Sequence, residues 1–140
     1  MTVRTAAETQ AGDVFGPVTV PVGRDTLVAY ARASGDGNPI HQDEDFAKSV
    51  GLPDVIAHGM WTLGAAGSVV SQWAGEAGRV LEFGSRFTKP VVVPATGADI
   101  VIDGIVKAVD SETRRATLDV TVTCGGAKVL GRCTAVIQLD

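Results

Sequence analysis

The sequence predicts an α+β fold in which an antiparallel sheet of about five strands curls around one long central helix. Two observations support this prediction. Segment 58–74 (HGMWTLGAAGSVVSQWA) is the longest stretch without strand character, and it holds so few polar residues that we expect solvent to reach little of it. After Gly78 the apolar period changes to two, and short turns separate the alternating segments, as in strands joined by hairpins.

The chain before the central helix is expected to form one strand and two helices. Segment 14–22 (VFGPVTVPV) is rich in β-branched residues and holds two prolines, which suits an edge strand. Segment 23–34 carries apolar residues at helical spacing and ends at the turn residue Gly35. Asp43 can cap a further short helix, which Gly51 is placed to end.

The chain after the central helix contains four strand candidates, at 79–93, 98–110, 114–124 and 127–139. A DSET segment and the pair Gly125–Gly126 lie between successive candidates and are predicted hairpin turns, the diglycine being the stronger signal. Within the central helix the run GAAG at 64–67 lowers helix propensity. We therefore expect a close approach there by the sheet, a partner or a ligand.

The composition indicates a single globular domain over residues 1–140, with 45% apolar and 20% charged residues. A net charge of −4 argues against a nucleic-acid-binding protein, which needs a basic face. No segment resembles a secretion signal or could span a bilayer, so we expect a soluble, cytoplasmic protein without a membrane partner. Cys124 and Cys133 lie in strand-like sequence without metal-ligand spacing, and we expect buried, inert thiols.

Segment 30–43 (YARASGDGNPIHQD) combines a bend with a titratable pair, Asp36 and His41. Glycines, an asparagine and a proline between and beside them are typical of a tight turn. If the bend brings the two side chains together, a neutral imidazole beside a carboxyl group can transfer protons at neutral pH. An isolated aspartate in such a bend more often has a turn or capping role, so the pair alone leaves both interpretations open.

The start of the predicted central helix offers a donor for a developing negative charge. The backbone N–H of Gly59 would have no intrahelical partner and would lie at the positive end of the helix dipole, as an oxyanion donor requires. For the neighbouring His58 we favour a structural role at the helix start over a catalytic one. An acid/base pair and an oxyanion donor together can add or remove a proton beside a carbonyl group.

Metal and cofactor chemistry is not expected. The segment HQDED resembles alternating metal ligands, but capping and N-terminal helix positions explain Asp43 and Asp45 better. The chain has no Gly-x-Ser-x-Gly elbow, no phosphate-binding glycine loop and no dinucleotide fingerprint. Proton transfer without a bound cofactor is the simplest chemistry that remains.

Segment 30–43 resembles the hydratase 2 motif of the MaoC-like, (R)-specific enoyl-thioester hydratases and dehydratases. The motif positions are, in order, Tyr30, Ser34, Gly35, Asp36, Gly37, Asn38, Pro39, Ile40 and His41. Segments 51–64 and 86–94 are similar to the next two blocks of that family, so the resemblance covers most of the chain. Ala33 departs from it, since the family more often has a larger aliphatic residue there. The chain looks most similar to the B-type catalytic subunit of the actinobacterial (3R)-hydroxyacyl carrier-protein dehydratases.

The resemblance implies a hot-dog fold and a reversible dehydration of (3R)-3-hydroxyacyl thioesters. It implies Asp36 and His41 as the catalytic dyad, Gly59 as the oxyanion donor, and Asn38 as a residue that holds the bend. Some relatives support the aspartate with a serine on the central helix; we do not transfer this role to Ser68. A non-catalytic or partner-dependent subunit of a heterodimeric dehydratase, and a hot-dog acyl thioesterase, are the alternatives.

The same resemblance implies a dimer, either of two copies or with a companion hot-dog subunit, that acts on acyl-CoA or acyl-carrier-protein thioesters. The carrier, the acyl chain length, the pathway and the dyad member that acts as base stay open. Six cationic residues could form a patch for phosphates or an acidic carrier, or could be ordinary solvated charges: Arg79, Arg86, Lys89, Arg114, Arg115 and Lys128.

Overall fold

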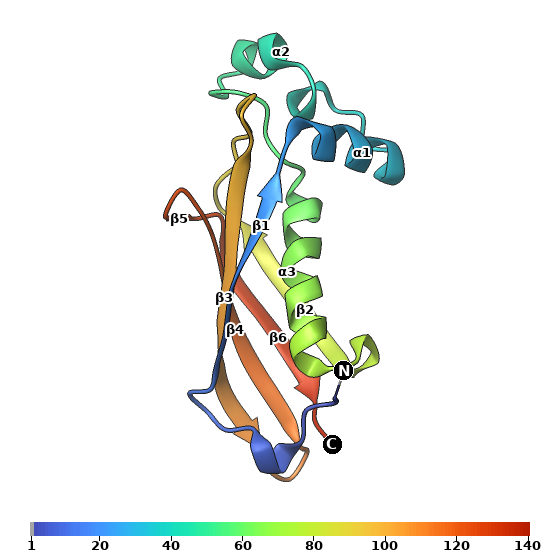
Figure 1. Ribbon diagram of the computed structural model, residues 1–140, viewed down its shortest axis with the longest axis vertical. Helices are drawn as coiled ribbons and strands as arrows, with labels where there is room; N and C mark the ends of the chain where they lie inside the picture. The colour runs from blue at the N-terminus through green and yellow to red at the C-terminus, as the bar shows by residue number, and fades with distance from the viewer. Residues whose placement is uncertain (1) are drawn as a thin grey trace.

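The computed structural model describes residues 2–140 and has a single antiparallel sheet curved around the central helix α3 (Gly59–Ala74), as Figure 1 shows. The strand order is β1-β3-β4-β6-β2, with the short β5 paired to β4. The strands are β1 (Val14–Val22), β2 (Val80–Phe87), β3 (Ala98–Asp110), β4 (Arg115–Cys124), β5 (Ala127–Lys128) and β6 (Leu130–Gln138). The other helices are η1 (Ala6–Glu8), α1 (Arg24–Ser34), η2 (Pro39–His41), α2 (Glu44–Ser49) and η3 (Ala77–Arg79).

The predicted helix-and-sheet layout is confirmed, including β1 at one edge of the sheet. The sheet has six strands where about five were expected, because segment 127–139 forms two strands. The left-handed φ angles of Gly125 (59°) and Gly126 (80°) turn the chain tightly into β5. Arg132 then adopts a left-handed φ of 47°, and the register of β4 against β6 differs from its register against β5. This change of register separates the two strands at Val129, whereas the left-handed Arg132 lies within β6.

The predicted strand 79–93 ends at Phe87, six residues early. Beyond it the chain leaves the sheet and runs beside the segment that precedes α3. The Ala57 N–H donates to the Val91 carbonyl at 2.9 Å, and the Val93 N–H donates to the Val55 carbonyl at 2.9 Å. This pairing places segment 87–91 next to the start of α3.

The expectation that solvent reaches little of α3 is wrong for one face of the helix. Met60, Gly64, Ser68 and Gln72 are exposed at a spacing of four residues. The opposite face is buried against the sheet, and its Ala66, Val70 and Ala74 are 0% exposed. A helix that packs against one sheet buries one face only, so a low polar content did not imply burial all round.

The small residues of α3 divide between these two faces. A Cβ atom on Gly67 would lie 3.2 Å from the Phe83 ring of β2, so the expected close approach by the sheet is confirmed there. A Cβ atom on Gly64 would meet no atom of residues 2–140 within 4 Å, so no contact in the described part of the chain explains that glycine.

The two cysteines differ in burial. Cys133 is buried as predicted, whereas Cys124 is only partly buried, which corrects the prediction for that residue. Burial raises the pKa of both thiols, which favours the unreactive protonated form.

Within residues 2–140, no helix has the length and apolar character needed to cross a membrane.

Candidate active site

The bend after α1 is built from local hydrogen bonds of the motif residues. Gly35 ends α1 with a left-handed φ of 79°, and its N–H donates to the Ala31 carbonyl at 3.0 Å. The Asp36 N–H donates to Ser34 Oγ at 3.1 Å, and the Asn38 N–H donates to Asp36 Oδ1 at 3.1 Å. Asn38 Oδ1 in turn accepts from the Ile40 N–H at 3.2 Å and opens η2. The sequence therefore specifies the bend through contacts that span two to four residues.

His41 lies at the end of η2 and is 7% exposed. Its Nδ1 lies 2.6 Å from the carbonyl oxygen of Ile56, so Nδ1–H donates and Nε2 keeps its lone pair. Burial lowers the pKa of His41 most; the Ile56 carbonyl raises it, nearby His58 lowers it, and the Asp36 carboxylate raises it. The net direction of the His41 pKa is downward, so the imidazole stays neutral to lower pH than an ordinary histidine and can act as a base.

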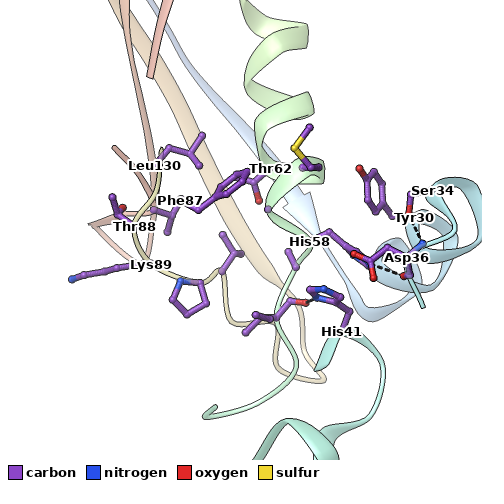
Figure 2. Close-up of a pocket in the computed structure, with 17 residues that line it drawn as sticks. Tyr30, Ser34, Asp36, His41, His58, Thr62, Phe87, Thr88, Lys89 and Leu130 are labelled. Atoms are coloured by element: carbon purple, nitrogen blue, oxygen red, sulfur yellow. Dashed lines mark hydrogen bonds between the residues drawn. The ribbon is translucent and has the colours of Figure 1, made fainter. Parts of the chain in front are cut away.

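The predicted pair does meet. Asp36, His41 and His58 each have a side-chain oxygen or nitrogen atom that lies within 4.8 Å of such an atom in the other two residues. Figure 2 shows Asp36, His41 and His58 grouped on one side of the pocket.

Gly59 is the first residue of α3, so its N–H has no acceptor within the helix. It lines the same pocket as Asp36 and His41. A Cβ atom at Gly59 would lie 2.9 Å from Cε1 of Phe87, which leaves space for no side chain unless that ring moves. The predicted acid, base and backbone donor thus share one cavity.

The pocket has a volume of about 500 Å³ and two chemically different walls. Asp36, His41 and His58 form the polar wall, which comes from the bend and the start of α3. The opposite wall comes from segments 87–91 and 129–130, and it holds Phe87 and Leu130 with Lys89 at its edge (Figure 2). An apolar wall facing titratable groups suits a ligand with an apolar part and a reacting polar group.

His58 has contacts that the sequence did not reveal. It is the N-cap residue of α3, is 2% exposed and forms no side-chain cap hydrogen bond. Instead Nε2 lies 3.1 Å from the backbone carbonyl of Asp36, and the ring stacks on that of His41 with centroids 3.7 Å apart. No sequence signal specifies the orientation of this ring, because both contacts join segments that are distant along the chain.

Within residues 2–140, one group of side chains could hold a metal ion, and it consists of Asp36, His41 and His58. Two of the four ring nitrogens are not available to an ion, because His41 Nδ1 and His58 Nε2 are each paired with a backbone carbonyl. The expectation that no metal site exists stays a prediction. Asp43 has its predicted capping role, since its Oδ1 accepts from the Phe46 N–H at 3.0 Å.

The six cationic residues do not gather into one patch. Arg79 of η3 pairs with Asp140 at 2.7 Å, and Arg114 and Arg115 lie at the turn between β3 and β4. Both places are at the end of the sheet opposite α1 and α2 in Figure 1. Of the six residues, Lys89 lines the pocket.

Comparisons with known proteins identify the family of this chain. Residues 6–126 match the family model described as MaoC like domain. The chain is 41% identical to 3-hydroxyacyl-thioester dehydratase X of Mycobacterium tuberculosis over 54% of this chain and 26% of that protein. The chain thus spans about a quarter of that relative's length.

Two solved structures share the fold closely. One is described as a MaoC-like dehydratase; it has a TM-score of 0.96 and 38% identity, and the match covers 99% of this chain and 43% of that one. The other is an (R)-hydratase from A. caviae involved in PHA biosynthesis, with a TM-score of 0.83 and 26% identity over 95% of this chain and 98% of that one. Family model, sequence relatives and fold agree, and the chain belongs to the MaoC-like domain family.

Proposed function

We propose that this chain interconverts (3R)-3-hydroxyacyl thioesters and trans-2-enoyl thioesters by removing and adding water. The observation that carries the proposal is that the Asp36 carboxyl group, the His41 imidazole and the Gly59 N–H line one pocket. The printed functions of the relatives, a 3-hydroxyacyl-thioester dehydratase and an (R)-hydratase, support the same reaction.

In the dehydration direction, the thioester oxygen accepts a hydrogen bond from the Gly59 N–H at the positive end of α3. This bond stabilises the negative charge that develops as the proton on C2 leaves. Asp36 and His41 take that proton and deliver a proton to the hydroxyl group on C3. The C2–H and C3–O bonds break, the C2=C3 bond forms, and the hydroxyl leaves as water. The proposal assigns both proton transfers to the dyad as a unit rather than one to each residue.

The substrate class follows from the two walls of the pocket. Phe87, Val129 and Leu130 offer apolar surface to the acyl thioester, opposite the dyad. Lys89 at the pocket edge offers a cation to the phosphate of coenzyme A or of a carrier-protein arm. We include both carriers in the proposal.

We further propose that the working form is a dimer, of two copies or with a companion hot-dog subunit as in the B-type dehydratases. β1 and β2 are the two ends of the strand order, and Leu81 and Phe87 of β2 are 45% and 56% exposed. A second sheet that joined such an edge would pair its free backbone groups and cover these side chains. The molar mass of the purified protein in solution, alone and with a companion, tests this part.

The reaction is tested by following the ultraviolet absorbance of an enoyl thioester with wild-type protein, Asp36→Asn and His41→Ala. Asparagine retains a side-chain oxygen for the Asn38 N–H, so Asp36→Asn removes the acid while preserving the bend. Each variant is expected to lose about 10²-fold or more in kcat, since general acid/base catalysis typically contributes 10² to 10⁴.

Asp43→Asn is the matched control, because Asp43 caps α2 outside the pocket and asparagine caps equally well. Wild-type rates in both dyad variants would exclude the assignment. Release of free thiol from an acyl thioester would indicate a thioesterase instead. Activity that appears only after a companion subunit is added would show a partner-dependent subunit.

A further inference from the structure

His58 occupies the centre of a column of three rings. Its ring lies between Tyr30 of α1, at a centroid distance of 4.7 Å, and His41 of η2, at 3.7 Å. It is 2% exposed, and its Nε2 lies 3.1 Å from the Asp36 carbonyl oxygen. One side chain at the start of α3 therefore contacts both members of the proposed dyad.

These contacts limit the movement of both dyad residues. The hydrogen bond from His58 Nε2–H to the Asp36 carbonyl joins the bend to the start of α3, 22 residues later in the chain. His41 is restrained in the ring plane by the bond from Nδ1 to the Ile56 carbonyl and across its face by the His58 ring. The bend itself rests on exposed short-range hydrogen bonds, so the His58 bond is a long-range restraint on its position.

The second nitrogen of His58 shows that packing alone does not explain the residue. Nδ1 is the one buried side-chain nitrogen or oxygen atom, among residues that are not exposed in the described part of the chain, that has no hydrogen-bond partner. A buried polar atom without a partner costs free energy. A phenylalanine could fill this space and stack on His41 without that cost, but it would lack the N–H that holds Asp36.

We propose that His58 is a positioning residue of this active site, which holds Asp36 through its Nε2–H and His41 through its ring face in the geometry that proton transfer requires. This inference rests on the proposed function, because the proposed function gives Asp36 and His41 their catalytic role.

His58 also affects the proton affinity of His41. The groups that face the His41 ring or line its pocket are Asp36 from the bend, His58 from the start of α3, Tyr30 behind His58, and Lys89 across the cavity. Of these, His58 lowers the pKa of His41 and Asp36 raises it. Replacing His58 by a residue that does not titrate removes the lowering contribution, so His41 should bind a proton at higher pH than in the wild-type protein.

Two variants separate the hydrogen bond from the packing. His58→Gln retains an amide N–H at about the reach of Nε2, and His58→Phe retains the stacked ring without a donor. We expect His58→Phe to fold as stably as the wild-type protein and to lose about 10²-fold in kcat with little change in KM, because small displacements of catalytic groups have effects of that size. His58→Gln should recover most of this loss, and the acidic limb of its kcat/KM profile should lie at higher pH.

A second readout does not require turnover. The chain has two histidines, so His58→Gln leaves His41 as the single imidazole to follow by nuclear magnetic resonance. We expect its titration midpoint to lie above the midpoint of His41 in the wild-type protein. Wild-type kcat in His58→Phe, or equal losses in both variants with an unchanged His41 midpoint, would overturn the proposal. If the wild-type protein shows no hydratase activity, alone or with a companion subunit, the proposed function fails, while the titration still reports on the contact between His58 and His41.

Discussion

The role of Gly59 can be tested by adding one methyl group. Gly59→Ala keeps the backbone N–H at the start of α3 and places a Cβ atom in the pocket. That atom would lie 2.9, 3.0 and 3.1 Å from three carbon atoms of the Phe87 ring. Ordinary carbon contacts begin near 3.4 Å, so the ring must retreat by roughly 0.5 Å. In the single chain Phe87 is 56% exposed and its ring can swing toward solvent, so the free energy of unfolding of one subunit should change little.

The effect on catalysis should be much larger than the effect on folding. A thioester oxygen that accepts from the Gly59 N–H must come within about 2.9 Å of the nitrogen, and the added methyl group competes for that space. Loss of one oxyanion donor typically reduces kcat by 10² to 10³, or about 2.7 to 4 kcal/mol of transition-state stabilisation. We expect Gly59→Ala to reduce kcat/KM for an enoyl thioester by about 10²-fold on this basis.

The double variant Gly59→Ala/Phe87→Ala separates two explanations of that loss. If the methyl group blocks the substrate, the double variant stays about 10²-fold below Phe87→Ala alone. If the loss comes from displacement of the Phe87 ring, removing the ring restores kcat/KM to the level of Phe87→Ala, and the oxyanion assignment is refuted. Gly78→Ala is the matched control, since a Cβ atom there meets nothing within 4 Å and Gly78 does not line the pocket.

Two further predictions concern stability. Burial lowers the pKa of His41 from its ordinary 6.5, so below that pH the unfolded chain binds more protons than the folded chain; the free energy of unfolding should fall as pH drops from 7.5 to 5.5. Urea unfolding at both pH values checks this, and an equally steep fall in His41→Gln would contradict it. Gly64→Ala should raise the free energy of unfolding by about 0.5–1 kcal/mol, because alanine favours the helix and its Cβ atom meets no neighbour. Gly67→Ala should raise the free energy of unfolding by less than Gly64→Ala does, or lower it, because its Cβ atom would lie 3.2 Å from Phe83. Equal rises in the thermal unfolding temperature of the two variants would show that this contact has no effect.

The sequence by itself was sufficient to predict features that depend on residues close together along the chain. The bend between Ser34 and Ile40 uses hydrogen bonds that reach two residues along the chain, and the α2 cap by Asp43 reaches three. Strands β1 and β3 have the predicted limits, because alternating side chains and turn residues specify a strand locally. For the same reason the sequence identified Asp36 and His41 as a pair.

The tertiary structure decided what surrounds that pair. The curved sheet and α3 bring Gly59 and His58 to the bend, and segment 87–91 forms the opposite wall because it leaves the sheet to pair with residues 55–57. The same packing leaves one face of α3 exposed. These contacts join residues that are far apart in sequence, so they depend on the curvature of the sheet and the direction of each segment. Residue type alone could name the participants of the site, whereas their spacing and the orientation of His58 follow from the assembled fold.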